Sequence, residues 1–157
     1  EAAQRSVLER IAHLVRLPPE AAEPMQVLRY TTNQHYFYHT DTGGAPSIAG
    51  RALTVLLYLN DEFEGGGTNF ALAGADEPRR NVYGVREEFD NCQTERGLTV
   101  RPRRGSVLLF YNLDPNSAAK SWWTWHCSAD VVSGEKRAAN LWYHLSLIRR
   151  AAERRRE

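Results

Sequence analysis

The sequence is poor in cysteine and methionine and contains no long apolar run. Its two cysteines, Cys92 and Cys127, are too few for a disulfide scaffold, although they could form one bridge, and a single pair leaves the compartment open. No apolar run approaches the length of a bilayer-crossing helix, and residues 1–5 lack the pattern of a signal peptide. We therefore expect no membrane insertion by this segment. Because it opens without Met and in a helical pattern, we also expect an excised domain.

The charge balance is close to neutral. Lysine and arginine number 20 against 19 aspartates and glutamates, so we expect no nucleic-acid partner. The exception is a basic tail, residues 148–157, which we expect to be a solvated helix end. A chain of 157 residues fits one domain with a sizeable core, and we predict a single domain over 1–157. The oligomeric state is left open.

An amphipathic helix is predicted over residues 2–16, and two prolines, Pro18 and Pro19, end it. The predicted barrel follows, over residues 25–147. Strand patterns occur in this part of the chain at 25–30, 35–40, 51–59, 98–101, 106–111, 127–132 and 137–147. We interpret the first two strands as a hairpin, and we count about eight short strands in all. This pattern favours a sandwich or jelly roll, and the absence of alternating helices argues against a parallel α/β sheet.

Two stretches without a strand pattern are candidates for substrate selection. Residues 71–97 form a long irregular stretch, and such loops are often functional or disordered. Three tryptophans, Trp122, Trp123 and Trp125, precede a histidine. Clustered tryptophans most often pack, but at the mouth of a site they could stack on a proline or another ring.

Three side chains are predicted to bind one metal ion. His39 and Asp41 lie two apart in an aromatic, strand-like segment, so both side chains should leave the same face of a sheet. His126, in a second strand-like segment, is the best candidate for a third ligand. Two imidazoles and one carboxylate form the facial arrangement of non-haem Fe(II) oxygenases, which leaves open positions on the metal. Because the histidines must be neutral to bind, metal affinity should fall in acid.

A lysine, Lys136, follows His126 by ten residues and should reach into the barrel from a neighbouring strand. A buried lysine is costly unless an anion pairs with it, which makes a dicarboxylate co-substrate its natural partner.

Five blocks of the sequence carry a family resemblance: YTTNQHYFYHTD at 30–41, RALTVLLYLN at 51–60, GGGTNF at 65–70, RPRRGSVLLF at 101–110 and GEKRAANLW at 134–142. In this order they resemble the catalytic domain of the prolyl 4-hydroxylases, which are Fe(II)- and 2-oxoglutarate-dependent dioxygenases. The resemblance runs from the first helix nearly to the end of the chain. It implies a mainly β fold, a double-stranded β-helix (jelly roll) with a supporting N-terminal helix.

The resemblance implies hydroxylation of prolyl residues to 4-hydroxyproline in a peptide or protein, with decarboxylation of 2-oxoglutarate to succinate. His39, Asp41 and His126 match the iron ligands, and Lys136 matches the residue that pairs with the far carboxylate of 2-oxoglutarate. Fe(II) is the implied metal, 2-oxoglutarate and O2 are the implied co-substrates, and ascorbate is a further implied cofactor.

Four more residues match positions of the family. Tyr30 and Thr68 match hydroxyl groups that help to hold the same carboxylate. Arg51 and Trp142 match positions that line the peptide groove. We therefore expect a proline-containing peptide or protein as the substrate.

The sequence also departs from the family pattern. Asn33 stands where glycine is usual, which a turn tolerates because asparagine readily enters left-handed conformations. The family has a cysteine three positions after the distal histidine, whereas here Cys127 follows His126 directly and Ala129 occupies the later place. The family's usual disulfide therefore does not carry over directly, although Cys92 lies in the expected loop.

Two other functions stay open from the sequence, and a third is disfavoured. The same chemistry could act on a free amino acid or small metabolite, or the barrel could be catalytically silent and only bind. A structural zinc domain is disfavoured, because such sites usually close their shell with four Cys or His ligands. Localisation is open: the endoplasmic reticulum or secretory pathway for a eukaryotic family member, and otherwise the cytoplasm.

Overall fold

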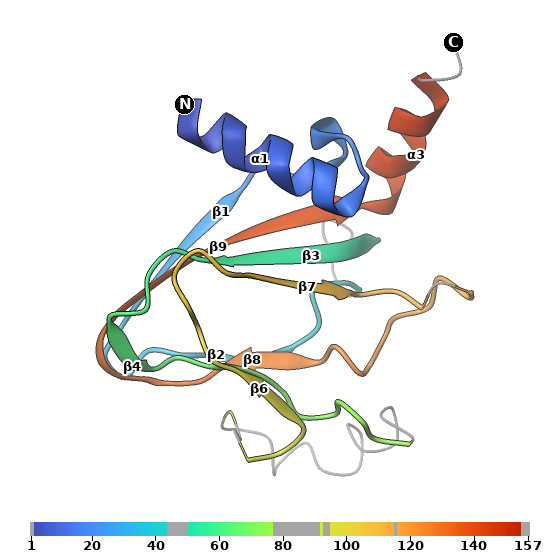
Figure 1. The fold of residues 1–157 in the computed structure, drawn as a ribbon. Coiled ribbons are helices and arrows are strands. Elements are labelled where there is room, and N and C mark those ends of the chain that lie inside the picture. Colours follow the sequence, from blue (N-terminus) through green and yellow to red (C-terminus); the bar gives the residue numbers. More distant parts are fainter. Residues whose placement is uncertain (1, 44–49, 77–91, 93–94, 115, 155–157) are drawn as a thin grey trace.

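The computed structural model describes residues 2–43, 50–76, 92, 95–114 and 116–154, and it shows two facing antiparallel β-sheets with helices over one of them (Figure 1). The elements are α1 (Ala2–Val15), the 3₁₀ turn η1 (Pro19–Ala21), β1 (Gln26–Thr31), β2 (Tyr36–His39), β3 (Arg51–Tyr58), β4 (Phe63–Gly65), β5 (Thr68–Phe70), β6 (Leu98–Val100), β7 (Val107–Tyr111), β8 (His126–Ser128), β9 (Val131–His144) and α3 (Leu145–Arg154).

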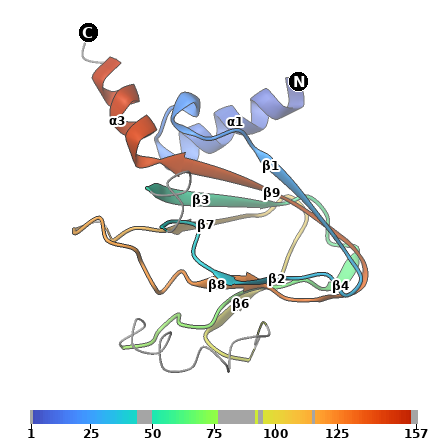
Figure 2. The same ribbon diagram turned by 180° about the vertical axis from the view of Figure 1, so that it is seen from behind.

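The two sheets have the strand orders β1-β9-β3-β7 and β2-β8-β5-β6, and β4 pairs with β9 beside the first sheet. We call them the major and the minor sheet. The chain alternates between them, so strands that are distant in sequence lie side by side, and Figure 2 shows the sheets as two layers from behind. The mainly β, jelly-roll prediction is confirmed. No helix among the described residues is long and apolar enough to cross a membrane.

Strand β3 separates the hydrophobic core from the barrel interior. Its alternate residues Leu53, Val55 and Leu57 are buried in the cluster that joins the major sheet to the helices. Leu56 and Tyr58 belong to a second cluster on the opposite face. Apolar residues on both faces are expected of a strand covered on both sides, as the sequence pattern predicted.

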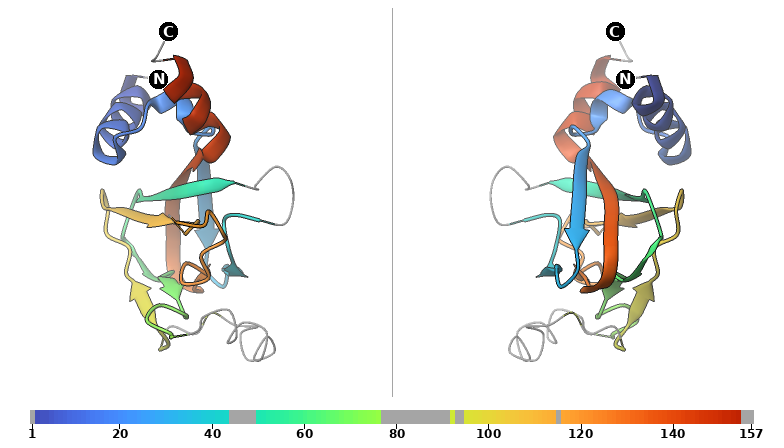
Figure 3. Two further views of the ribbon diagram at one scale, coloured as in Figure 1. Left: turned by 90° about the vertical axis from the view of Figure 1, so that its right-hand side faces the viewer. Right: turned by 90° about the vertical axis from the view of Figure 1, so that its left-hand side faces the viewer.

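The helices cover the outer face of the major sheet, on the side away from the minor sheet (Figure 3). α1 contributes Ile11, η1 contributes Ala21 and α3 contributes Ala151 to the core cluster. α1 ends one residue earlier than predicted, because Arg16 adopts a left-handed conformation with φ 57°. The N–H of Leu17 then donates to the carbonyl of Ala12 at 3.2 Å, the bond that closes a Schellman motif.

Two of the strand predictions are wrong. β1 and β2 do not form a hairpin: β1 pairs with β9 in the major sheet and β2 pairs with β8 in the minor sheet. The turn at Asn33, with φ 64°, therefore leads from one sheet to the other. The predicted strand break at 133–135 is also absent, because Gly134 takes φ 83° while it stays paired with Phe63 of β4.

Other boundaries differ as well. The predicted strand 127–132 is divided between β8 and β9, and residues 145–147 belong to α3 rather than to the last strand. The basic tail is helical up to Arg154, and residues 155–157 lie outside the described residues. Two three-residue strands, β4 and β5, lie on either side of Gly66 and Gly67, in a part of the chain for which no strand was predicted. Most of the predicted irregular stretch 71–97, namely 77–91 and 93–94, also lies outside the described residues.

The two cysteines form a disulfide. Cys92 and Cys127 are bonded with their Cα atoms 5.8 Å apart, although they are separated by 35 residues in sequence. Cys127 is fully buried in β8. The bond therefore ties the segment before β6 to the strand that carries His126, and it resolves a pairing that the altered cysteine spacing had left open.

Adjacent valines at the start of β9 offer a matched test of the core. Val131 is fully buried, whereas Val132 is 62% exposed. We expect Val131→Ala to lower the free energy of unfolding by about 2 kcal/mol, because it deletes two buried methyl groups and leaves a cavity. Val132→Ala should change it by less than about 0.5 kcal/mol. Urea denaturation of both variants measures the difference, and equal effects would contradict this arrangement of the core.

Candidate metal centre

Two imidazoles are brought together by strand pairing in the minor sheet. His39 is the last residue of β2 and His126 is the first of β8, and the two residues are direct partners across the antiparallel pair. Their ring centroids lie 4.3 Å apart. Side chains that face each other across neighbouring strands leave the same side of the sheet, so both rings enter the barrel interior.

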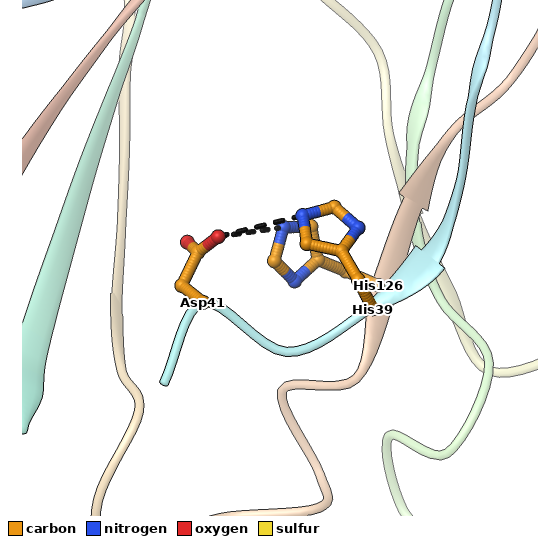
Figure 4. A group of neighbouring side chains, drawn as sticks. All are labelled: His39, Asp41 and His126. Atoms are coloured by element: carbon orange, nitrogen blue, oxygen red, sulfur yellow. Dashed lines mark ion pairs between the residues drawn. The ribbon is translucent and has the colours of Figure 1, made fainter. Parts of the chain in front are cut away.

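A carboxylate faces both rings. Oδ1 of Asp41 lies 3.4 Å from Nε2 of His39 and 3.9 Å from Nε2 of His126 (Figure 4). One possible ligand atom from each of the three residues lies within 4.8 Å of the other two. Asp41 is not on the strand, because β2 ends at His39; the chain turns after the strand and presents the carboxylate from the side. The prediction of one strand for both residues is therefore wrong, but the predicted convergence is observed.

Hydrogen bonds to the backbone fix which nitrogen of each ring faces the carboxylate. Nδ1 of His39 lies 2.8 Å from the carbonyl oxygen of Phe37, and Nδ1 of His126 lies 2.8 Å from that of Thr124. A carbonyl only accepts, so each Nδ1 carries a proton and Nε2 is the ring nitrogen that faces Asp41. In the neutral form of such a ring, Nε2 has the lone pair that a metal needs. Orientation of this kind by a backbone carbonyl is usual for histidines that bind metals.

Electrostatics favour the metal-binding forms of Asp41 and His126. Burial alone would raise the pKa of Asp41, but the hydrogen bond with His39, the charge of His126 and the hydrogen bond from Thr54 outweigh it and hold that pKa below its ordinary value. Burial, and then the neighbouring charge of His39, lower the pKa of His126 from 6.5 to about 4. At neutral pH the site therefore offers a carboxylate and a neutral His126.

The donor set fits a divalent cation. Two nitrogen lone pairs and a carboxylate oxygen converge on one point, and among the described residues no further His, Cys, Asp or Glu belongs to the group. Two imidazoles and one carboxylate suit non-haem Fe(II), and a fourth protein ligand would be expected of a structural zinc site. Metal binding by these residues stays a prediction, but the structure places all three where it requires them.

All eight site residues predicted from the sequence line one cavity between the sheets, with a volume of about 360 Å³. They are Tyr30, His39, Asp41, Arg51, Thr68, His126, Lys136 and Trp142. They come from both sheets and from the segment after β2, so the cavity exists only when the barrel is closed.

Lys136 is an unusual cation because it is 2% exposed. Its Nζ donates to the carbonyl oxygen of Gly66 at 2.6 Å and to Oγ of Ser128 at 2.8 Å. No carboxylate among the described residues forms an ion pair with it. It lies on β9 of the major sheet, which is not paired with β8, so the predicted neighbouring-strand placement is wrong, although the predicted reach into the barrel is observed.

Burial lowers the pKa of Lys136 from 10.5 to about 8. This fall corresponds to a cost of about 3 kcal/mol for the protonated form. Because the folded pKa is below the unfolded value, the charged lysine destabilises the ligand-free fold below about pH 8, and the cost disappears as pH rises toward 10.5. An anion bound in the cavity would offset this cost.

Hydroxyl groups surround the lysine. The rings of Tyr30 and Tyr58 lie 5.6 and 5.9 Å from Nζ of Lys136. The hydroxyl of Tyr58 donates to Oγ1 of buried Thr68 at 2.8 Å. This end of the cavity thus combines one ammonium group with several hydroxyls, which is a suitable environment for a carboxylate.

Arg51 and Trp142 lie together on the cavity wall. The guanidinium carbon of Arg51 is 3.7 Å from the centroid of a Trp142 ring, and the group donates two hydrogen bonds of 2.8 Å to the carboxylate of Glu23. The indole nitrogen of Trp142 is buried and has no partner among the described residues. Arg51 is therefore a rigid part of the wall, with its charge already paired.

Sequence reasoning missed four polar residues of the site: Thr54, Tyr58, Asn112 and Ser128. Thr54 and Tyr58 alternate on β3 and face the barrel, so the strand pattern could have placed them there. Ser128 follows His126 by two residues on β8, and the same alternation could have found it. Asn112 follows β7 directly, and no pattern in the sequence pointed to it.

The tryptophans have different environments. Trp125 is buried and stacks on Tyr38 with a centroid distance of 4.4 Å, so it is a packing residue. Trp123 is 46% exposed, and its indole donates to the carbonyl of Ala75 at 3.0 Å. Nζ of Lys120 lies 4.8 Å from the centroid of a Trp122 ring.

A two-sheet barrel with two histidines, one carboxylate and a buried lysine around one cavity is the arrangement expected of a non-haem iron oxygenase. The model of the 2OG-Fe(II) oxygenase superfamily matches residues 25–144, and the chain belongs to this family. The family implies Fe(II) and 2-oxoglutarate, with O2, as the reactive components.

The chain is similar to several prolyl hydroxylases. Prolyl 4-hydroxylase 13 of Arabidopsis thaliana is 36% identical over 141 residues, which cover 87% of this chain and 48% of the relative. Probable prolyl 4-hydroxylase 4 of the same plant is 35% identical over 142 residues, with 87% and 46% covered. The chain thus spans about half the length of these relatives.

A solved structure shows the same fold. It is the viral collagen prolyl hydroxylase of Paramecium bursaria Chlorella virus-1 in its 2OG complex, which is 25% identical to this chain with a TM-score of 0.56. The match covers 90% of this chain and 67% of the viral one. The jelly-roll assignment therefore has an experimental counterpart.

The metal site can be tested with a matched pair of histidines. We expect His126→Ala to weaken Co(II) binding by more than about 100-fold, because one of three converging ligands is lost. His35→Ala should leave binding unchanged, since His35 pairs with Asp130 at 2.8 Å outside the ligand group. Absorption titrations with Co(II) measure both, and equal effects of the two variants would contradict the site.

The pKa of Lys136 predicts how 2-oxoglutarate affinity changes with pH. Below about pH 8 the lysine is protonated and would pair with a bound anion, whereas above this pH the free protein would have to take up a proton to bind it. The dissociation constant should therefore rise up to tenfold for each pH unit above 8. Calorimetry on Mn(II)-loaded protein under argon measures it. Lys136→Arg, which stays charged, should remove this rise, and a rise of the same size in that variant would assign it to another group.

Proposed function

We propose that this chain is the catalytic part of a prolyl 4-hydroxylase, which hydroxylates prolyl residues of a peptide or protein and converts 2-oxoglutarate to succinate. One observation carries the proposal: a triad of metal-binding type and a buried lysine without a carboxylate partner among the described residues line the same cavity. The names of the similar proteins, which are prolyl 4-hydroxylases, support the choice of substrate.

Different residues of the cavity would bind the metal and the co-substrate. His39, Asp41 and His126 would hold Fe(II), which with 2-oxoglutarate and O2 supplies the oxidation of a substrate C–H bond. Lys136 would bind the far carboxylate of 2-oxoglutarate as its counter-ion. The protein fixes the position of that carboxylate before O2 reacts, and the closed barrel excludes water from the reacting groups.

Hydroxyl groups would share the far carboxylate with Lys136. Tyr30 and Thr68 line the same part of the cavity, and Thr68 is oriented by the hydrogen bond from Tyr58. A hydroxyl held by a neighbour loses little freedom when it binds an anion, so the arrangement favours tight binding.

The peptide would pass along the wall that Arg51 and Trp142 form. Because Glu23 already neutralises Arg51, the guanidinium offers shape and N–H groups rather than a free positive charge. We therefore expect selection by backbone and ring shape, and no requirement for an acidic residue next to the proline.

Assay of succinate formation tests the proposal. Fe(II)-loaded protein is incubated with 2-oxoglutarate and a panel of proline-containing peptides, with and without ascorbate, and His126→Ala serves as the blank. We expect one or more peptides to raise turnover at least about tenfold and to gain the mass of one oxygen on proline.

Each other outcome has a meaning. Succinate formation stimulated by free proline or another small molecule, and by no peptide, would favour a small-metabolite oxygenase. Absence of succinate from a folded, iron-loaded protein would favour a barrel that only binds. Ascorbate dependence in the same assay tests that cofactor separately from the substrate.

A further inference from the structure

The two oxygens of Asp41 have different surroundings. Oδ1 faces the histidines, at 3.4 Å from His39 and 3.9 Å from His126. Oδ2 accepts a hydrogen bond of 2.6 Å from the hydroxyl of Thr54, and both residues are buried. Thr54 lies on β3 of the major sheet, whereas His39 and His126 lie on the minor sheet. The carboxylate is therefore contacted from both sheets.

A second donor fixes the direction of this hydrogen bond. Nδ2 of Asn112 lies 2.7 Å from Oγ1 of Thr54. A carboxylate oxygen accepts and a hydroxyl donates, so the single hydroxyl proton of Thr54 points to Oδ2 of Asp41. The oxygen of Thr54 is then left to accept from Asn112, and the amide must present its NH2 group. The chain of hydrogen bonds therefore runs from Asn112 through Thr54 to Asp41.

The orientation of Asn112 leaves a polar atom unpaired. Asn112 is 1% exposed, and its Oδ1 has no hydrogen-bond partner among the described residues. An unpaired buried oxygen is unfavourable. We therefore attribute this orientation of the amide to the hydrogen bond that its NH2 group donates to Thr54. Its backbone is fixed as well: its N–H donates to the carbonyl of Ala52 and its carbonyl accepts from the N–H of Ser121.

We propose that Thr54 and Asn112 are positioning residues that keep Asp41 a ligand through one oxygen only. The inference rests on the proposed metal site. A carboxylate that coordinates through both oxygens occupies one more position of the ion, and the reaction needs free positions for 2-oxoglutarate and O2. The hydrogen bond from Thr54 would hold Oδ2 away from the metal. The hydrogen bond that Asn112 donates to the Thr54 oxygen makes the Thr54 hydroxyl a stronger donor to Oδ2.

The test separates the hydroxyl of Thr54 from its shape. Thr54→Val keeps the size and removes the donor, whereas Thr54→Ser keeps the donor. With Co(II) as the probe, we expect the valine variant to change the visible absorption spectrum and to bind about tenfold more weakly. The serine variant should retain the wild-type spectrum. A wild-type spectrum and affinity for Thr54→Val, or the same defect in both variants, would overturn the proposal.

The role of Asn112 is tested by coupling it to Thr54. Asn112→Leu should shift the Co(II) spectrum in the wild-type background but have no further effect in Thr54→Val, because Asn112 acts through the hydroxyl that this variant lacks. Equal spectral shifts in both backgrounds would show that Asn112 acts independently and would overturn its part of the proposal.

One measurement needs no variant and covers the case in which Thr54→Val does not fold. Infrared difference spectra of wild-type protein with isotope-labelled aspartate, with and without Co(II), distinguish carboxylate binding through one oxygen from binding through two by the separation of the two C–O stretches. We expect the wide separation of the one-oxygen mode, and the narrow separation would overturn the proposal. Failure of wild-type protein to bind Co(II) at all would instead overturn the proposed function.

Discussion

The pairing of β2 with β8 is the interaction on which the rest of the site depends. It makes His39 and His126 direct partners and places their rings 4.3 Å apart. The backbone carbonyls of Phe37 and Thr124 then orient both rings, so the imidazoles are prepared by main-chain geometry and not by flexible side chains. Asp41 completes the set from the segment after the strand. The disulfide between Cys92 and Cys127 attaches a further segment to the same strand.

The major sheet carries buried polar groups of the site on one face and the hydrophobic core on the other. Its outer face is packed against α1, η1 and α3, and this core supports buried polar groups on the inner face. Lys136 and Thr54 both lie on that inner face, on β9 and β3. The unfavourable burial of Lys136 therefore falls on β9, a strand whose other face is covered by the hydrophobic core. The unpaired amide oxygen of Asn112 lies directly after β7, and the NH2 group of the same side chain donates to Thr54 of β3.

Much of this arrangement could be predicted from the sequence, for reasons that differ between residues. The two faces of β3 were evident because its residues alternate, and His39, Asp41, His126 and Lys136 stood out because few side chains bind metals or dianions. The other four site residues were predicted only from the family resemblance. The partners of β1 and β2 could not be predicted, since a turn at Asn33 is compatible with a hairpin as well as with a change of sheet. Asn112 was missed because its role depends on contacts with residues distant in sequence.

The central claim is that His39, Asp41 and His126 hold one iron ion in the cavity that Lys136 also lines. Anomalous diffraction at the iron edge, from crystals soaked with Fe(II) without oxygen, tests this most directly. The account predicts one strong peak within bonding distance of both Nε2 atoms and of one oxygen of Asp41, with no fourth protein ligand. A peak elsewhere, or a metal whose shell is closed by a fourth side chain, would contradict it.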